Sequence, residues 1–167
     1  LMIRLLESAD DASDRTLWSE AITKFGEHFR TAAEDAAPTG IPTNFQPDSF
    51  TLGAFEGGAL IGVVSVAREH GVKLRHKALL SRMFIHPDAA GLGLGKLMLH
   101  ETIMLAVSVP DLRQIYLTVL ETNEPAQRLY AAAGFRSYSH EPDAVKIGDA
   151  YVAELQMVRI LRRDTRG

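Results

Sequence analysis

The chain has 167 residues with a net charge of −3, and 46% of its residues are hydrophobic. That length can bury the core of one domain, so we expect a single domain over residues 1–167. The absence of cysteine excludes disulfides, thiolate nucleophiles and cysteine-ligated zinc, and no apolar run approaches the ~18 residues of a membrane span. The acidic balance argues against nucleic acid as a partner. The acidic, polar first twenty residues argue against a targeting peptide, so we expect a cytoplasmic protein.

The first half of the chain is predicted to form a strand, a helix and an antiparallel hairpin. Apolar residues at three- and four-residue spacing predict a helix over Leu17–Ala37, with Gly26 as a break between two helices. Proline and glycine predict a loop over 38–47, which contains Pro38, Gly40, Pro42 and Pro47. The segment 56–59 has the composition of a hairpin turn. The strands of this half are expected at Met2–Leu6, Phe50–Phe55 and Leu60–Ala67.

The second half is predicted to alternate strands and helices before a final pair of strands. Asn123 caps a helix that has Pro125 in its first turn and stops at Gly134. The basic stretch Arg68–Arg82 is predicted to be largely a solvent-facing hairpin. A polar loop with Pro142 and Gly148 is expected between the last two strands. The other elements are expected as strands at Ala78–Ile85, Ile115–Leu120, Phe135–His140 and Tyr151–Ile160, and a helix at Lys96–Val107.

A glycine-rich loop, Gly91-Leu92-Gly93-Leu94-Gly95-Lys96, lies between a predicted strand and a predicted helix. Glycine at every second residue lets backbone N–H groups turn toward one anion, and the start of the helix adds its positive dipole end. A pyrophosphate is the ligand that we expect such a loop to bind. The loop is not a P-loop, because Ala90 replaces its glycine and Leu97 its Ser or Thr, and it lacks the spacing of a dinucleotide fingerprint. An ordinary tight turn is the structural alternative.

A second motif lies further along the chain and adds specificity to the loop. It consists of Leu117-Thr118-Val119, Asn123, Ala126, Leu129-Tyr130 and Gly134-Phe135. With the glycine loop, it resembles the GNAT superfamily of N-acetyltransferases over about residues 50–160. The resemblance implies an α/β (α+β) fold with a mixed, centrally splayed sheet of six to seven strands and helices on both faces. It also implies acetyl-CoA as co-substrate and no metal, with the cofactor in a cleft between the strands that end at Ile85 and Leu120.

The same resemblance implies roles for individual residues. Tyr130 is expected to protonate or hydrogen-bond the leaving thiolate, although its position also suits a core aromatic. Asn123 is expected to serve both as a helix cap and as a donor on the cofactor side. The cofactor-binding set is Met83, Phe84, Ile85, Gly91, Leu92, Gly93, Leu94, Gly95, Lys96, Asn123, Ala126 and Tyr130.

Two positions depart from the family pattern. Ala90 stands where the family usually has Arg or Gln at the head of the loop, so we expect weaker cofactor binding. The strand before the loop lacks the glutamate that many relatives carry as a base. Glu154 on the last strand and His76 before the third are the candidate bases, and Glu121 is a candidate for orienting the turn before Asn123. A water relay is the alternative.

The function implied is direct transfer of an acetyl group from acetyl-CoA to a primary amine. The acceptor stays open between a small-molecule amine and an amine of a peptide or protein. Two other classes stay open as well. One is a non-catalytic acyl-CoA-binding sensor of the same fold, which Ala90 and the missing carboxylate permit. The other is a nucleotide-binding module. A homodimer is common in such folds.

Overall fold

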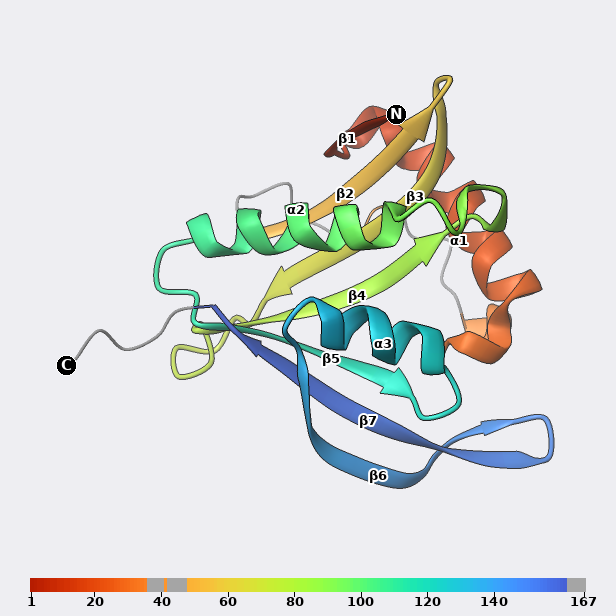
Figure 1. Ribbon diagram of the computed structural model, residues 1–167, viewed down its shortest axis with the longest axis vertical. Coiled ribbons are helices and arrows are strands. Elements are labelled where there is room, and N and C mark those ends of the chain that lie inside the picture. Colours follow the sequence, from red (N-terminus) through yellow and green to blue (C-terminus); the bar gives the residue numbers. More distant parts are fainter. Residues whose placement is uncertain (36–40, 42–47, 162–167) are drawn as a thin grey trace.

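The protein is described from a computed structural model, which covers residues 1–35, 41 and 48–161. Its strands form one seven-stranded sheet in the order β1-β2-β3-β4-β5-β7-β6 (Figure 1). Apart from Ile41, the loop predicted over 38–47 lies outside the described residues. The strands are β1 (Met2–Leu5), β2 (Ser49–Glu56), β3 (Ala59–Arg68), β4 (Lys77–Ile85), β5 (Gln114–Leu120), β6 (Arg136–Ile147) and β7 (Ala150–Ile160).

The sheet splits between its two parallel strands. β4 pairs with β5 only from Lys77 to Leu79, opposite Gln114 to Tyr116. All other neighbouring strands are antiparallel and pair over most of their length, as β5 and β7 do from Gln114 to Leu120. The carboxyl ends of β4 and β5 therefore diverge, as Figure 1 shows. The expectation of a mixed, centrally splayed sheet is confirmed.

Helices cover both faces of the sheet (Figure 1). On one face, α2 (Leu94–Ser108) and α3 (Glu124–Ala132) enclose the larger core with buried residues such as Met98, Ile115 and Tyr130. On the other face, α1 (Asp11–Lys24) packs Leu17 and Ala21 in a smaller core with Phe84. Among the described residues, no helix is both long and apolar enough to cross a bilayer.

The first helix is shorter than the sequence predicted. α1 ends at Lys24, and the chain continues in two short 3-10 turns, η2 (Gly26–His28) and η3 (Ala33–Asp35). The helix ends here because Phe25 leaves the helical conformation at φ −127°. Its ring packs 5.9 Å from Phe84 of the sheet. The break predicted at Gly26 agrees with the structure, whereas the second helix predicted after it is replaced by η2 and η3 within the described residues. Ala36 and Ala37 lie outside the described residues.

The last two strands are longer than predicted. β6 runs through Pro142 to Ile147, so the prediction of a polar loop between the last two strands is wrong for this segment. Only Gly148 and Asp149 separate the two strands. The pairing register shifts between Glu141 and Val145, which is where Pro142 lies. β6 is an edge strand, and a proline is tolerated on an edge strand at a bulge because no further strand needs its missing N–H.

Candidate functional site

The glycine loop joins β4 to α2 through one more short turn, η4 (Pro87–Ala89). Gly91 has φ +81° and Gly93 has φ +75°, conformations that residues with a Cβ rarely adopt. A Cβ built on either glycine would meet no heavy atom within 4 Å, so the space beside the backbone is open. Gly93 is also the N-cap of α2 and provides no side-chain cap. The start of α2 is therefore bare backbone.

The N–H groups of this loop are available to a ligand. Ala90 donates to the Pro87 carbonyl and Leu97 to the Gly93 carbonyl, but those from Gly91 to Lys96 have no partner among the described residues. The exposed Lys96 lies in the first turn of α2, where the helix dipole disfavours a cation, and pairs with no carboxylate in the described ranges. Unpaired N–H groups and an unpaired cation fit a pyrophosphate.

Helix α3 brings the second motif to the same place. The Asn123 side chain accepts a hydrogen bond from the Ala126 N–H at 3.3 Å, so its predicted role as helix cap is confirmed. A Cβ on Gly95 would lie 3.4 Å from Leu129 of α3 and 3.6 Å from Met83 of β4. The start of α2, Leu129 of α3 and the end of β4 thus converge on one side of the split sheet.

Tyr130 is buried in α3 and packs edge-on against Phe135 at 5.8 Å. Its hydroxyl has no hydrogen-bond partner in the described part of the chain. Burial raises the pKa of the phenol, so the group stays protonated at neutral pH. The hydroxyl can therefore donate a hydrogen bond to a ligand, while the ring also has the core role foreseen as the alternative.

The end of β4 presents backbone groups to the split. His86 donates its N–H to the Ile61 carbonyl of β3 at 2.8 Å. Successive residues of an antiparallel strand direct their backbone groups to opposite sides, so Ile85 directs its N–H and C=O away from β3. β5 does not pair with β4 at this level, and these groups face the gap. An extended ligand can pair with them as an added strand would.

A bulge in β4 lies next to this segment. Arg82 has φ +55°, and Arg82 and Met83 together stand opposite Val64 alone. The Arg82 guanidinium binds both carboxylate oxygens of the buried Asp14, at 2.9 and 2.8 Å. Its Cζ lies 4.9 Å from the centre of the Trp18 ring. The prediction that the basic stretch faces solvent is therefore wrong for Arg82. Its partner Asp14 lies far away in the sequence, so the residues around Arg82 give no indication of this ion pair.

Glu154 is the strongest candidate for a base in the described residues. Met157 of β7 packs in the core under α2 and α3, so Glu154, an odd number of residues away, points to the opposite face, the face of α1. Its side chain is 2% exposed, and its Oε1 makes no hydrogen bond. Glu154 pairs in register with Leu120, the last residue of β5, and so lies at the mouth of the split.

The surroundings of Glu154 favour its protonated form. Burial raises the pKa of this carboxyl above its ordinary value of 4.5, and the neighbouring Glu141 adds to the rise. Arg30 acts in the opposite direction. Its Nη2 lies 3.4 Å from the Glu154 Oε1, an ion-pair distance without the geometry of a hydrogen bond. A carboxyl with a raised pKa beside a cleft is suited to accepting a proton.

An aromatic cluster positions the chain around Arg30. Phe29 lies 5.0 Å from Trp18 and 6.2 Å from Phe84, measured between ring centres. Phe84 belongs to the end of β4, whereas Phe29 directly precedes Arg30. The segment after α1 is thereby fixed against the α1 side of the split, across the sheet from the glycine loop.

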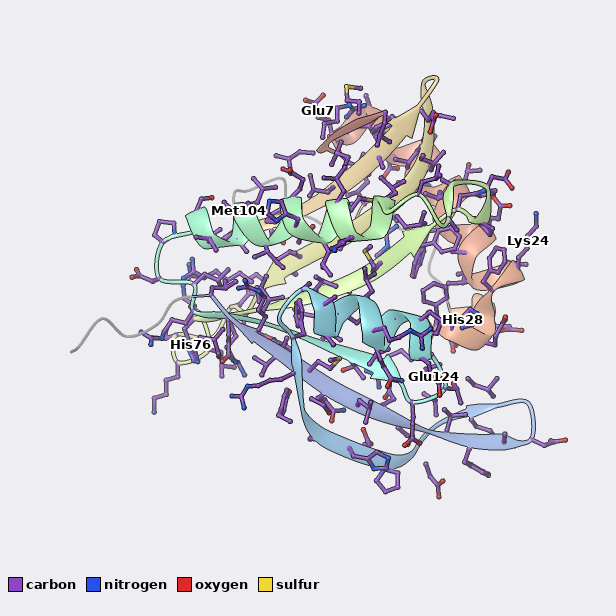
Figure 2. All side chains as sticks on the ribbon, in the orientation of Figure 1. Glu7, Lys24, His28, His76, Met104 and Glu124 are labelled. Atoms are coloured by element: carbon purple, nitrogen blue, oxygen red, sulfur yellow. The ribbon has the colours of Figure 1, made fainter. Side chains whose placement is uncertain are left out.

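The structure does not bring His76 into this site. His76 precedes β4, and its carbonyl accepts hydrogen bonds from the N–H groups of Arg113 and Gln114. β4 has nine residues, so His76 and the end of β4 are roughly 25 Å apart. Figure 2 shows His76 at the other end of the sheet from Glu124, which follows the end of β5. A base role for His76 does not fit this geometry.

Glu121 is exposed and pairs with His140 at 3.2 Å. It therefore links the turn after β5 to β6, and its N–H donates to the Ala153 carbonyl of β7. This contact fits the predicted role of orienting the turn before Asn123. Within the described ranges, no group of three or more potential ligand side chains is placed to hold a metal.

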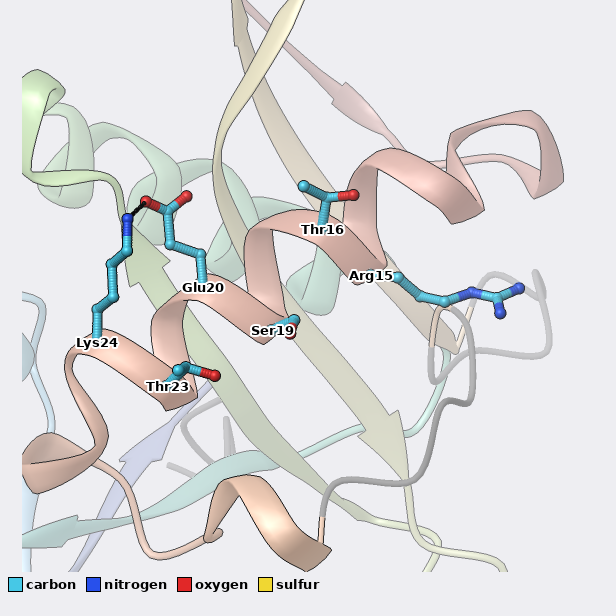
Figure 3. Close-up of a pocket in the computed structure, with 6 residues that line it drawn as sticks. All are labelled: Arg15, Thr16, Ser19, Glu20, Thr23 and Lys24. Atoms are coloured by element: carbon cyan, nitrogen blue, oxygen red, sulfur yellow. Dashed lines mark hydrogen bonds and ion pairs between the residues drawn. The ribbon is translucent and has the colours of Figure 1, made fainter.

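A shallow depression on the exposed side of α1 lies outside this site. Figure 3 shows Glu20 and Lys24 pairing at 3.0 Å across one helical turn within it. None of the predicted site residues lines it, although its residue Glu20 lies 3.5 Å from the imidazole of His86, which directly follows β4. It is lined by Arg15, Thr16, Ser19, Glu20, Thr23 and Lys24.

Comparison with known proteins agrees with this arrangement. The profile of the Acetyltransferase (GNAT) family matches residues 15–135. Among solved structures, a GNAT-family acetyltransferase from Streptococcus pneumoniae is 22% identical, with a TM-score of 0.82 over 96% of this chain and 99% of that one. A GCN5-related N-acetyltransferase from Kribbella flavida is 24% identical, with a TM-score of 0.81 over 96% and 97%.

A third structure, yncA from Salmonella typhimurium, was solved with its cofactor acetyl-CoA. It is 17% identical, with a TM-score of 0.82 over 99% of this chain and 96% of that one. Identities this low show a shared fold, whereas the family match covers most of the chain and includes the loop, both parallel strands and Tyr130. The chain therefore belongs to the GNAT acetyltransferase family.

Proposed function

We propose that the protein is an acetyl-CoA-dependent N-acetyltransferase that transfers the acetyl group directly to a primary amine. One observation supports a catalytic role above all others. Glu154 is a buried carboxyl without a hydrogen bond, at the mouth of the split and on the face opposite the glycine loop. Such a group costs folding stability and is difficult to explain in a module that only binds a cofactor.

The glycine loop and the start of α2 would hold the pyrophosphate through the N–H groups of Gly91 to Lys96. Lys96 would supply a cation in place of the side chain missing at Ala90. Backbone groups at Ile85 and Met83 would pair with the pantetheine arm, whereas those of Phe84 between them face β3. Acetyl-CoA supplies the acetyl group as an activated thioester.

Glu154 would accept a proton from the acceptor's ammonium, because only a neutral amine is a nucleophile. The nitrogen–carbon bond then forms as the carbon–sulfur bond breaks. The second proton of the nitrogen leaves as the amide forms, and the departing sulfur gains a proton. Tyr130 would donate a hydrogen bond to that sulfur. With no cysteine in the chain, no protein thiol can carry the acetyl group.

Kinetics of two matched variants test the role of Glu154. Glu154→Gln is expected to lower kcat at least about 10²-fold in an assay of thiol release with amine acceptors, because proton transfer contributes about that much or more. Glu56→Gln makes the same change at an exposed hairpin position and is expected to leave kcat unchanged. Full activity of Glu154→Gln would replace the side-chain base with a water relay.

The alternative is an acyl-CoA sensor that binds the cofactor without turnover. Ala90 and the absence of a carboxylate on β4 favour it. Binding of coenzyme A by calorimetry, together with no thiol release for any amine, would support the sensor. A single domain over residues 1–167, a cytoplasmic location, a homodimer and independence of nucleic acid and metal stay predictions.

A further inference from the structure

The ion pair between Arg30 and Glu154 joins two groups of very different exposure. The Glu154 side chain is 2% exposed and the Arg30 side chain 62% exposed, with 3.4 Å between Nη2 and Oε1. Glu154 is the one carboxylate that pairs with Arg30 among the described residues. The position of Arg30 is not that of a loose surface residue, because the preceding Phe29 packs against both Trp18 and Phe84.

The charges at this position restrict the acceptor. An amine arrives mostly as an ammonium ion, and its proton must reach Glu154. Arg30 already lies beside the same carboxylate. A simple monovalent ammonium would therefore bring a second positive charge to a single buried negative charge, and the two cations would repel each other. An acceptor that carries its own negative charge removes this conflict.

We infer that the acceptor is a small amine with an anionic group a few bonds from its nitrogen, of which a free amino acid is the simplest example. In this arrangement Glu154 binds the ammonium and Arg30 binds the anion. The inference rests on the proposed function and names its substrate class. The short distance between Arg30 and Glu154 selects a ligand whose two charges are close together. A guanidinium binds a carboxylate through two parallel hydrogen bonds.

Binding of such an acceptor would also prepare the base. Arg30 lowers the pKa of Glu154, whereas burial and Glu141 raise it. An acceptor carboxylate that draws the guanidinium away from Glu154 leaves the acceptor's ammonium as the cation beside this carboxyl. Once the ammonium has given its proton to Glu154, neither cation remains there to lower the pKa of the carboxyl.

The experiment compares acceptors that differ only in their anionic group. Each of a set of L-amino acids is assayed beside its carboxamide and its methyl ester, and butylamine serves as an amine without any second group. Thiol release gives kcat and KM for each acceptor, and calorimetry gives the affinity for coenzyme A. Amides and esters have less basic amines than the free acids, so intrinsic reactivity favours them, and a preference for the acid must come from the protein.

We expect the wild-type protein to prefer the acid in kcat/KM by about tenfold to a hundredfold, the contribution of a hydrogen bond to a charged group. Arg30→Gln should abolish this preference by raising KM for the acid much more than KM for the amide, and Arg30→Lys should retain part of it. Arg136→Gln removes an exposed arginine at the start of β6 and should keep the full preference. Coenzyme A affinity should be the same in all of them.

Three results would overturn the inference. Equal use of acid and amide by the wild-type protein would show that the anion is not recognised. Equal losses for acid and amide in Arg30→Gln would assign Arg30 a general role. Acetylation of butylamine but of no amino acid would contradict the substrate class while supporting the proposed function. If coenzyme A binds and no amine at all is acetylated, the proposed function fails too.

Discussion

At the scale of single residues, the burial of Glu154 connects function to stability. Burial raises the pKa of its carboxyl, so the folded protein binds this proton more tightly than the unfolded chain does. Protonation of Glu154 therefore stabilises the fold fully below about pH 4.5, and this stabilisation is lost as the pH rises through the raised pKa. At neutral pH the buried carboxyl of Glu154 therefore lowers the stability of the fold. Its proposed role as the base would explain why the chain has it.

Replacement of this carboxyl should therefore stabilise the protein at neutral and alkaline pH. Glu154→Gln resembles the protonated form and is expected to raise the free energy of unfolding at pH 8 by about 1 kcal/mol. The gain should shrink as the pH falls toward 4.5, where the wild-type residue is itself protonated. Urea unfolding over this pH range measures the difference. A gain that does not depend on pH would point to packing instead of charge.

Tyr130 gives a second test at this scale. Tyr130→Phe keeps the ring that packs against Phe135 and removes only the hydroxyl, which has no partner among the described residues. The fold and the affinity for coenzyme A should therefore change little, whereas kcat should fall about 10²-fold if the hydroxyl assists the departing sulfur. Steady-state kinetics and a melting curve measure both effects. An unchanged kcat would leave Tyr130 with its core role alone.

The sequence identified Glu154 but not its environment. A glutamate on an alternating strand usually faces solvent, whereas this one is buried and has its ion-pair partner, Arg30, far away along the chain. His76 has a suitable intrinsic pKa, yet a pKa carries no information about which end of a strand a residue occupies. The cap at Asn123 was predicted correctly, because a helix cap is a local property.

At the scale of elements, the loop before α2 offers mainly backbone N–H groups to the proposed pyrophosphate. An added side-chain donor should therefore strengthen the binding of coenzyme A. Ala90 is exposed, with φ −70° and ψ 154°, a conformation open to any residue. Ala90→Arg should add a charged hydrogen bond to the pyrophosphate and tighten coenzyme A binding about tenfold to a hundredfold. Calorimetry measures the change. Leu92→Arg adds the same charge two residues later, so an equal gain in both would indicate general attraction, and no gain at Ala90 would contradict the prediction.

The elements near the ends of the chain were the least predictable. Phe29 continued a helical pattern in the sequence beyond the break predicted at Gly26, but its ring packs on Phe84 and short 3-10 turns stand where the second helix was predicted. Pro142 indicated a loop, although an edge strand with a bulge accommodates it. In both cases the deciding partner lies elsewhere in the sheet. The hairpin turn at Gly57 and Gly58 was predicted from its composition. Such turns require positive φ, which glycine adopts readily, and both glycines have positive φ in the structure.

At the scale of the whole molecule, the split sheet would separate the proposed sites of the two substrates. The glycine loop, α2 and α3 lie on one face, and α1, Arg30 and Glu154 lie on the other. The gap between the ends of β4 and β5 connects them, since these strands pair over only three residues. The motifs implied the splayed sheet through the family resemblance, but they did not indicate that the parallel pairing ends at Leu79 and Tyr116.

A single-turnover experiment tests the proposed direct transfer of the acetyl group from acetyl-CoA to an amine. The protein is loaded with acetyl-labelled acetyl-CoA, mixed with an amino acid acceptor and quenched at intervals. With direct transfer, we expect the label to stay on the cofactor until the amine is added. It should then move to the amine with release of one thiol for each acetyl group, and it should never reside on the protein. Label that remains on acetyl-CoA with every amine, or that accumulates on the protein, would contradict direct transfer.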